Sequence, residues 1–386
     1  MGTKNRHQLN IIGGSVAGLC AAREAAESGI DVCVFEEHRE IGVPEKCDGL
    51  VSAKGISELG LVPPSTVVQN RLRTALFFSP AMKEIKIDAS KQNVIVMDRS
   101  RFDKFLAEEA AKAGAKIEIG KRVAKYESGT ANVFLKIDGD ELESDLLLDC
   151  SGYESYINSG GSALQGGQFL VCGSWFEKST VEVYIDPDAY PAFFKWVIPI
   201  SSNVAKIGVA GNGINTFSIL DEFAKEKNAE VLRKMAAPVL CFGALKSLVE
   251  GRVAKVGDAA GQAKPTTGGG IYTGGFGGLL AGRAAVSAIK EENPALLANY
   301  ESEWRAKFGK EFRLQMYARN AFSKMTAEQV NKLFEMISSS DLPRTISEEG
   351  DFDRHSVALA KGLGLAKLAS TFSMLFTNEL RSLLGL

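Results

Sequence analysis

The stretch that decides the fold is LNIIGGSVAG at positions 9–18, followed by an alanine-rich segment and by DVCVF at 31–35. The order of apolar strand, glycine turn, helix and second strand predicts a β-α-β unit. Gly13, Ser15 and Gly18 occupy the three places of a G-x-G-x-x-G turn, with serine at the place where that pattern has its middle glycine.

This turn has the chemistry of a phosphate site. Its backbone N–H groups and the helix N-terminus that follows can hold a pyrophosphate, and an acid at the end of the next strand can bind a ribose hydroxyl. Glu36 lies at that strand end, 18 residues after Gly18. The unit therefore predicts a dinucleotide site, and the motif alone leaves open a glycine turn in another kind of α/β protein.

A second motif, KVGDAA at 255–260, follows a short apolar strand far along the chain. An aspartate after glycine at a strand end can bind a ribitol or ribose hydroxyl. Asp258 lies 240 residues after Gly18. The pair of motifs predicts one dinucleotide site that is closed by two distant parts of the chain.

The intervening sequence changes character at residues 168–211, which are rich in aromatic residues and alternate apolar with polar positions over 180–186. We predict an antiparallel sheet there, joined by residues 71–88. The resulting division is a dinucleotide-binding domain (1–70, 94–152 and 250–293), a substrate-binding β-sheet domain (71–93 and 153–249) and a helical C-terminal region (294–386).

Composition narrows the class of protein. Among 386 residues, 45 Lys and Arg oppose 47 Asp and Glu, and a net charge of −2 argues against nucleic-acid binding. The three histidines are far apart and the six cysteines show no framework spacing, so we predict no metal site and reduced thiols. The N-terminus lacks the apolar run of a signal peptide, and the charge-free run 265–282 has too many glycines for a membrane span. We expect a cytoplasmic protein.

The sequence resembles the archaeal geranylgeranyl reductase family, a branch of the FAD-dependent hydroxylase-like superfamily. The matching pieces are GGSVAG at 13–18, FEEHREIG at 35–42, KCDGLVS at 46–52, DRSRFDKFL at 98–106, DCSGYES at 149–155, FFKWVIP at 193–199 and GDAAGQAKPTTGGGI at 257–271. The resemblance implies an α/β fold, with a Rossmann-like FAD-binding domain of the GR2 type, an antiparallel β-sheet substrate domain and a helical C-terminal region.

FAD is the cofactor that the resemblance implies. Carried over residue by residue, the cofactor-binding positions are Gly13, Ser15, Ala17, Gly18, Glu36, Cys47, Asp48, Gly49, Arg99, Val123, Asp258, Gly269, Gly270 and Ile271. Glu36 is expected at the adenosine ribose, Val123 at the adenine through its backbone, and Asp258 at the ribityl chain. The glycines before Ile271 are expected at the N1–C2=O edge of the flavin, where helix N-terminal amides stabilise negative charge.

Cys47 is the candidate catalytic residue, as a thiol that donates a proton to the alkene carbon opposite hydride transfer. The alternative is a small residue that packs in a tight loop. Phe194, Trp196 and Pro199 are the implied substrate-binding residues. Phe194 stands at the place of the family's tyrosine and Ile200 at the place of its lysine, which leaves the lipid head group open.

The resemblance implies hydrogenation of C=C bonds in geranylgeranyl chains of archaeal membrane lipids or their precursors. Its partners would be an isoprenoid lipid and an external electron donor, either ferredoxin or NAD(P)H. Two alternatives stay open: an FAD-dependent monooxygenase or halogenase of the same fold, and a flavoprotein without enzymatic activity. The apolar, basic tail at 355–386 can lie on the inner face of a membrane or pack on the body of the protein.

Overall fold

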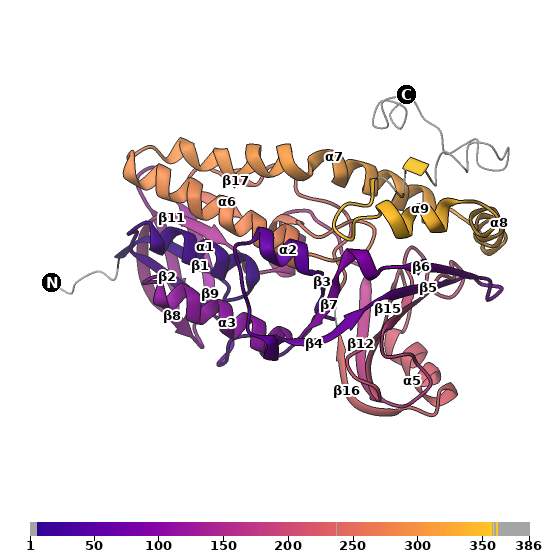
Figure 1. Cartoon of the computed structure of the whole chain (residues 1–386). Helices are drawn as coiled ribbons and strands as arrows, with labels where there is room; N and C mark the ends of the chain where they lie inside the picture. Colours follow the sequence, from indigo (N-terminus) through magenta and orange to yellow (C-terminus); the bar gives the residue numbers. More distant parts are fainter. Residues whose placement is uncertain (1–5, 237, 357, 359, 362–386) are drawn as a thin grey trace.

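The computed structural model describes residues 6–236, 238–356, 358, 360 and 361. In this part of the chain the strands form three sheets, with long helices along one side (Figure 1). The fold is the mixed α/β fold that the sequence predicts, with a parallel core, a mainly antiparallel second sheet and helices toward the C-terminus. Where its domains begin and end stays a prediction.

The first sheet has the order β17-β18-β11-β1-β2-β8, and β10 and β9 extend it beyond the N-terminal half of β11. Neighbouring strands from β18 to β8 are parallel, so their carboxyl ends share one edge. Ligands of such sheets bind at that edge. The strands are β1 (Arg6–Ile12), β2 (Val32–Glu36), β8 (Lys116–Ile119), β9 (Val123–Ser128), β10 (Val133–Ile137), β11 (Asp140–Asp149), β17 (Val249–Glu250) and β18 (Val253–Lys255).

Helices cover this sheet and supply most of its core. They are α1 (Val16–Glu27), α2 (Ala53–Glu58), α3 (Arg99–Lys112), α4 (Tyr153–Asn158), α6 (Ile271–Lys290) and α7 (Ala298–Phe322). The alanine-rich sequence predicts a helix from Leu19 to Ser28. Helix α1 begins three residues earlier, because Val16 already faces the core and is 5% exposed. A three-stranded sheet lies beside them, in the order β3 (Leu50–Ser52), β7 (Val94–Met97) and β4 (Val68–Leu72).

The second large sheet has the order β16-β12-β15-β14-β13-β5-β6. Its strands are β5 (Thr74–Phe78), β6 (Glu84–Asp88), β12 (Gln165–Cys172), β13 (Thr180–Tyr184), β14 (Lys195–Pro199), β15 (Val204–Gly211) and β16 (Glu230–Ala236). The sheet is antiparallel, as predicted, except at one place, where β13 and β5 pair in parallel. The two strands come from segments about 100 residues apart, so no hairpin fixes their direction.

The aromatic residues of this sheet divide between its two faces. Helix α5 (Thr216–Glu226) covers one face, where Phe169, Trp175, Phe176 and Tyr184 join its core (Figure 1). Phe193, Phe194 and Trp196 belong to a separate cluster on the other side. From the sequence, these seven rings could either form a core or line a long apolar tunnel. The first group forms the core under α5, so the tunnel interpretation stays open only for the second group.

The C-terminal region continues with α8 (Ala327–Ser338) and α9 (Leu342–Glu349), which pack on β6 (Figure 1). Most of the tail considered for membrane contact, residues 362–386, lies outside the described residues. Within the described part of the chain, no helix combines the length and the apolar character needed to cross a bilayer.

Helices α1 and α6 approach one another through glycines. A Cβ atom on Gly278 would lie 2.2 Å from the carbonyl oxygen of Ala17, and one on Gly282 would lie 2.7 Å from that of Ala21. Because these neighbours are backbone atoms, they cannot move aside as a flexible side chain would. The sequence is rich in glycine, with 39 among 386 residues, and part of this content serves the helix contact.

We predict that Gly278→Ala forces α1 and α6 apart, destabilises the protein and weakens FAD binding, because α1 begins at the phosphate turn. Gly309→Ala in α7 is the control: its new Cβ meets nothing nearer than 3.7 Å, and alanine favours a helix over glycine by about 0.5–1 kcal/mol. The unfolding temperature should fall for Gly278→Ala and rise slightly for Gly309→Ala. A shift in the same direction for both variants would contradict the steric argument.

Candidate cofactor site and active site

The phosphate turn at the carboxyl end of β1 needs its outer glycines for steric reasons. Gly13 has a φ of +101°, and a Cβ there would lie 2.3 Å from the carbonyl oxygen of Cys150. A Cβ on Gly18 would lie 2.1 Å from the carbonyl oxygen of Gly13. The turn is therefore packed between the ends of β1 and β11. Ser15, at the middle place, is the exposed N-cap of α1, and its side chain makes no capping hydrogen bond.

Glu36 ends β2 beside this turn. Its carboxylate accepts hydrogen bonds from the N–H of Gly14 at 2.7 Å and from that of His38 at 2.9 Å. Its own carbonyl accepts from the N–H of Lys121 at 2.8 Å, which brings the start of β9, with Val123, to the same side of the sheet edge. These contacts place the residues expected at the adenosine end of a dinucleotide next to one another.

Arg99 connects the turn to the next group of predicted residues. One guanidinium nitrogen lies 3.0 Å from Ser15 Oγ and 3.0 Å from Asp103 Oδ1, and Ser15 Oγ also donates to Asp103 at 2.9 Å. Burial alone would lower the pKa of Arg99, but the carboxylate of Asp103 and the thiol of Cys47, which the guanidinium contacts, raise it above its usual value. Arg99 therefore stays charged between the turn and Cys47.

Cys47 and Asp48 lie in a loop that is fixed at both sides. Gly49 has a φ of +80° and accepts a hydrogen bond at its carbonyl from the N–H of Met97. The Asp48 carboxylate accepts from the indole N–H of Trp196 at 3.1 Å, and burial raises its pKa. The Cys47 thiol is half-buried and accepts from the N–H of Gly49 at 3.4 Å.

The second motif reaches the same place from the other end of the chain. The 3₁₀ helix Gly257–Ala260 follows β18, and a Cβ on Gly257 would lie 2.7 Å from Cβ of Ala17. Asp258 is exposed, and its carboxylate has no hydrogen bond or ion pair within the described residues. Its surroundings raise its pKa, and the nearby positive charge of Arg99 opposes this increase. A Cβ on Gly270 would lie 3.2 Å from this carboxylate.

This set of groups fits FAD. Helices α1 and α6 both begin without a side-chain cap, so their first N–H groups remain available to a pyrophosphate and to a flavin carbonyl. Asp258 is an exposed acid that has no hydrogen-bond partner among the described residues, as a ribityl-binding residue requires. Gly269 and Gly270 are half-buried just before Ile271, the first residue of α6, and they present backbone instead of side chains.

The three implied substrate-binding residues do not all lie together in the structure. Phe194 and Trp196 lie together, with ring centroids 5.9 Å apart, and Phe194 stacks on Phe193 at 4.0 Å. Since the indole of Trp196 bonds to Asp48, this aromatic group adjoins the Cys47 loop. Pro199 ends β14 in a buried position, and strand alternation places its ring on the face opposite Trp196.

Several residues of the site were not predicted. Asp103 is 4% exposed and binds both Ser15 and Arg99, and Lys264 is 4% exposed beside Gly269, where its ammonium donates to the carbonyl of Phe352 at 2.8 Å. Glu45 and Lys206 support the Cys47 loop. The helical spacing of Arg99 and Asp103 is a signal that could have identified that pair. The others join segments too distant for any local pattern.

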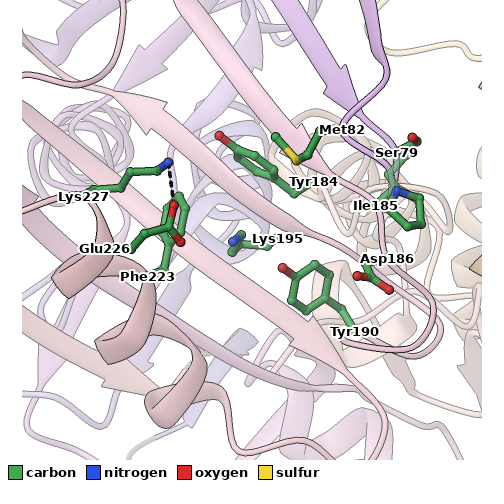
Figure 2. Close-up of a pocket in the computed structure, with 11 residues that line it drawn as sticks. Ser79, Met82, Tyr184, Ile185, Asp186, Tyr190, Lys195, Phe223, Glu226 and Lys227 are labelled. Atoms are coloured by element: carbon green, nitrogen blue, oxygen red, sulfur yellow. Dashed lines mark hydrogen bonds and ion pairs between the residues drawn. The ribbon is translucent and has the colours of Figure 1, made fainter.

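A cavity of about 130 Å³ lies elsewhere, between β13, β14 and α5 (Figure 2). Lys195 projects toward it, with its ammonium 3.7 Å from the ring centre of Phe223 and 4.7 Å from that of Tyr184. Burial lowers the pKa of Lys195 to about 8. Because Lys195 and Trp196 are consecutive in one strand, this cavity opens on the face of the sheet away from the Cys47 loop.

Comparisons with known proteins agree with this geometry. Residues 6–168 match the FAD binding domain family. The chain is 27% identical to digeranylgeranylglycerophospholipid reductase 2 of Methanopyrus kandleri, covering 88% of this chain and 92% of that protein. It is 30% identical to an uncharacterized protein of Methanocaldococcus jannaschii, covering 94% of this chain and 97% of that protein.

Among solved structures, a geranylgeranyl bacteriochlorophyll reductase-like protein from Thermoplasma acidophilum superposes with a TM-score of 0.83 at 20% identity. The match covers 95% of this chain and 99% of that one. Fold and site thus define a flavin-dependent oxidoreductase whose cofactor is FAD. The chain belongs to the geranylgeranyl reductase family, which includes the digeranylgeranylglycerophospholipid reductases.

We predict that Glu36→Gln weakens FAD binding about tenfold or more, since a charge-assisted hydrogen bond contributes about 1.5–3 kcal/mol. Glu37→Gln is the matched control, because the neighbouring carboxylate is 49% exposed and should change FAD affinity less than about twofold. Quenching of flavin fluorescence during titration of the apoprotein measures both affinities. Equal affinities for the two variants would remove Glu36 from the cofactor site.

Proposed function

We propose that this protein hydrogenates C=C bonds of geranylgeranyl chains in archaeal membrane lipids or their precursors. The observation that carries the proposal is its similarity, over nearly the whole chain, to digeranylgeranylglycerophospholipid reductases. The aromatic group beside the Cys47 loop supports it, because an isoprenoid chain needs an apolar wall next to the reacting groups. The electron donor we propose is external, either ferredoxin or NAD(P)H.

Reduced FAD supplies the hydride in such a reaction, and saturation of a C=C bond also needs one proton. We assign the proton to the Cys47 thiol. Arg99 contacts this thiol and is itself held by Asp103, so the sulfur has a fixed orientation. On the other side of the loop, Trp196 is fixed by Asp48 and limits where an alkyl chain can lie.

The first N–H groups of α6 have a separate role. They lack a side-chain cap and lie next to Gly269 and Gly270, so they can stabilise negative charge that develops on a bound partner. Lys264 places a buried ammonium beside the same loop. Its carboxylate partner Asp353 lies 3.5 Å away and is also bonded to Ser52, which connects the C-terminal segment to this end of the site.

The test is anaerobic incubation of the dithionite-reduced holoprotein with a digeranylgeranylglycerophospholipid, followed by mass spectrometry of the lipid. We expect a gain of two hydrogens for each reduced bond. Cys47→Ala should slow the reaction about tenfold or more without loss of bound FAD, because a positioned proton donor contributes about 10²–10⁴-fold. Cys172→Ala, on β12, should leave the rate unchanged.

Insertion of oxygen into an aromatic substrate, with O₂ consumed in the presence of NAD(P)H, would instead support the monooxygenase alternative. An unchanged lipid across a panel of geranylgeranyl compounds would overturn the proposal. An unchanged rate for Cys47→Ala would remove the thiol as proton donor and leave the reductase assignment standing.

A further inference from the structure

Lys206 is a buried cation in the middle of the second large sheet. It lies on β15, and its side chain is 1% exposed. A lysine so far from water requires compensation for the lost hydration of its ammonium. The partners that supply it show what this residue holds in place.

Within the described residues, the hydrogen-bond partners of this ammonium all belong to the loop that carries Cys47. Lys206 Nζ donates to Glu45 Oε1 at 2.9 Å, to the carbonyl of Cys47 at 3.0 Å and to the carbonyl of Asp48 at 3.2 Å. An ammonium has three N–H groups, so its donor capacity is filled. One ammonium on a strand thus holds three residues of the same loop, Glu45, Cys47 and Asp48.

Glu45 strengthens the attachment of this loop to the sheet. Its second carboxylate oxygen accepts from Arg233, on β16, at 3.0 Å, and its first oxygen also accepts from the backbone N–H of Arg99 at 3.3 Å. Burial by itself would raise the pKa of Glu45, but Lys206 and Arg233 outweigh burial and lower it. The carboxylate is therefore ionised at neutral pH, and it connects β15, β16 and the start of α3 to the loop.

The loop has two further attachments, from Trp196 to Asp48 and from Met97 to Gly49. Neither holds the backbone of Cys47 itself. Lys206 does so directly, while Arg99 contacts the thiol at the other end of the same residue. The sulfur therefore lies between a cation that fixes its backbone and a cation that orients its side chain.

We propose that Lys206 is a positioning residue for Cys47, which keeps the thiol in place from within the sheet that forms the aromatic wall. That the position of the thiol matters for catalysis rests on the proposed function. The ammonium does not touch the reacting atoms and acts only through the Cys47 loop. The substrate sheet thus carries both the wall for the lipid and the support for the thiol.

The experiment compares Lys206→Met with Lys195→Met in the FAD-loaded protein. Lys195 is a matched control, because it is 8% exposed on the neighbouring strand β14 and contacts aromatic rings on the other face instead of the loop. Native alkylation by iodoacetamide, resolved for each cysteine by mass spectrometry, measures the position of the thiol. Hydrogen exchange of residues 45–49 measures the backbone of the loop.

We expect Lys206→Met to raise the alkylation rate of Cys47 about fivefold or more and to speed hydrogen exchange of the loop. Lys195→Met should change both by less than about twofold, even where it lowers the unfolding temperature equally. Cys172 serves as the internal reference for general loosening. Lys206→Arg should restore part of the protection, because a guanidinium can donate to the same oxygens.

Equal changes at Cys47 and Cys172, or equal changes in the two methionine variants, would show a merely structural role and overturn the inference. If Lys206→Met does not fold, Glu45→Gln replaces it, with a smaller but still Cys47-specific increase expected. These measurements need no lipid. Failure of the wild-type protein to reduce an alkene would therefore contradict the proposed function while leaving this inference intact.

Discussion

The close approach of α1 and α6 is the constraint on which the rest of the structure depends. Gly278 and Gly282 allow the backbone of α6 to lie against the carbonyls of Ala17 and Ala21. Glycine loses more conformational entropy on folding than any other residue, so a glycine-rich helix is costly by itself. The cost is offset because the contact brings the phosphate turn, at the start of α1, next to Asp258 and the start of α6.

The uncapped N-termini of α1 and α6 then both lie beside the Gly257–Ala260 segment. In a protein without a ligand, unsatisfied N–H groups are ordinarily capped by a side chain or by water. Here Ser15 turns its hydroxyl to Asp103 instead of to its own helix, and Gly270 has no side chain to offer. The departure of Ser15 from the glycine pattern thus has a structural reason: its hydroxyl joins the Asp103–Arg99 pair that leads on to Cys47.

The sequence was most informative where a segment has one strong periodicity. The sequence predicts strands over Lys116–Ile119, Val133–Ile137 and Glu84–Asp88, and the structure has strands with the same bounds. The strand β16 was not predicted, because EVLRKMA is an edge strand with mostly exposed, charged side chains and no clear alternation. The glycine turn and Asp258 were accessible because each motif is local, and the resemblance supplied the remaining cofactor positions.

The residues that support the Cys47 loop could not be predicted from the sequence, and the reason is physical. Lys206 and Glu45 are 161 residues apart, and a lysine in a strand is ordinarily read as facing solvent. Only the three-dimensional structure shows that the two residues form an ion pair and that Lys206 is buried.

A buried ion pair contributes little to stability, since desolvation offsets much of the Coulomb attraction, but it requires a specific geometry. The Lys206–Glu45 pair lies between the aromatic cluster and the Cys47 loop. An apolar contact of the same size has no directional bonds, so it would let the loop shift along the sheet. Directional bonds from one ammonium to three oxygens restrict that sliding, and this is a property that an enzyme needs where a flexible lipid chain meets a single thiol.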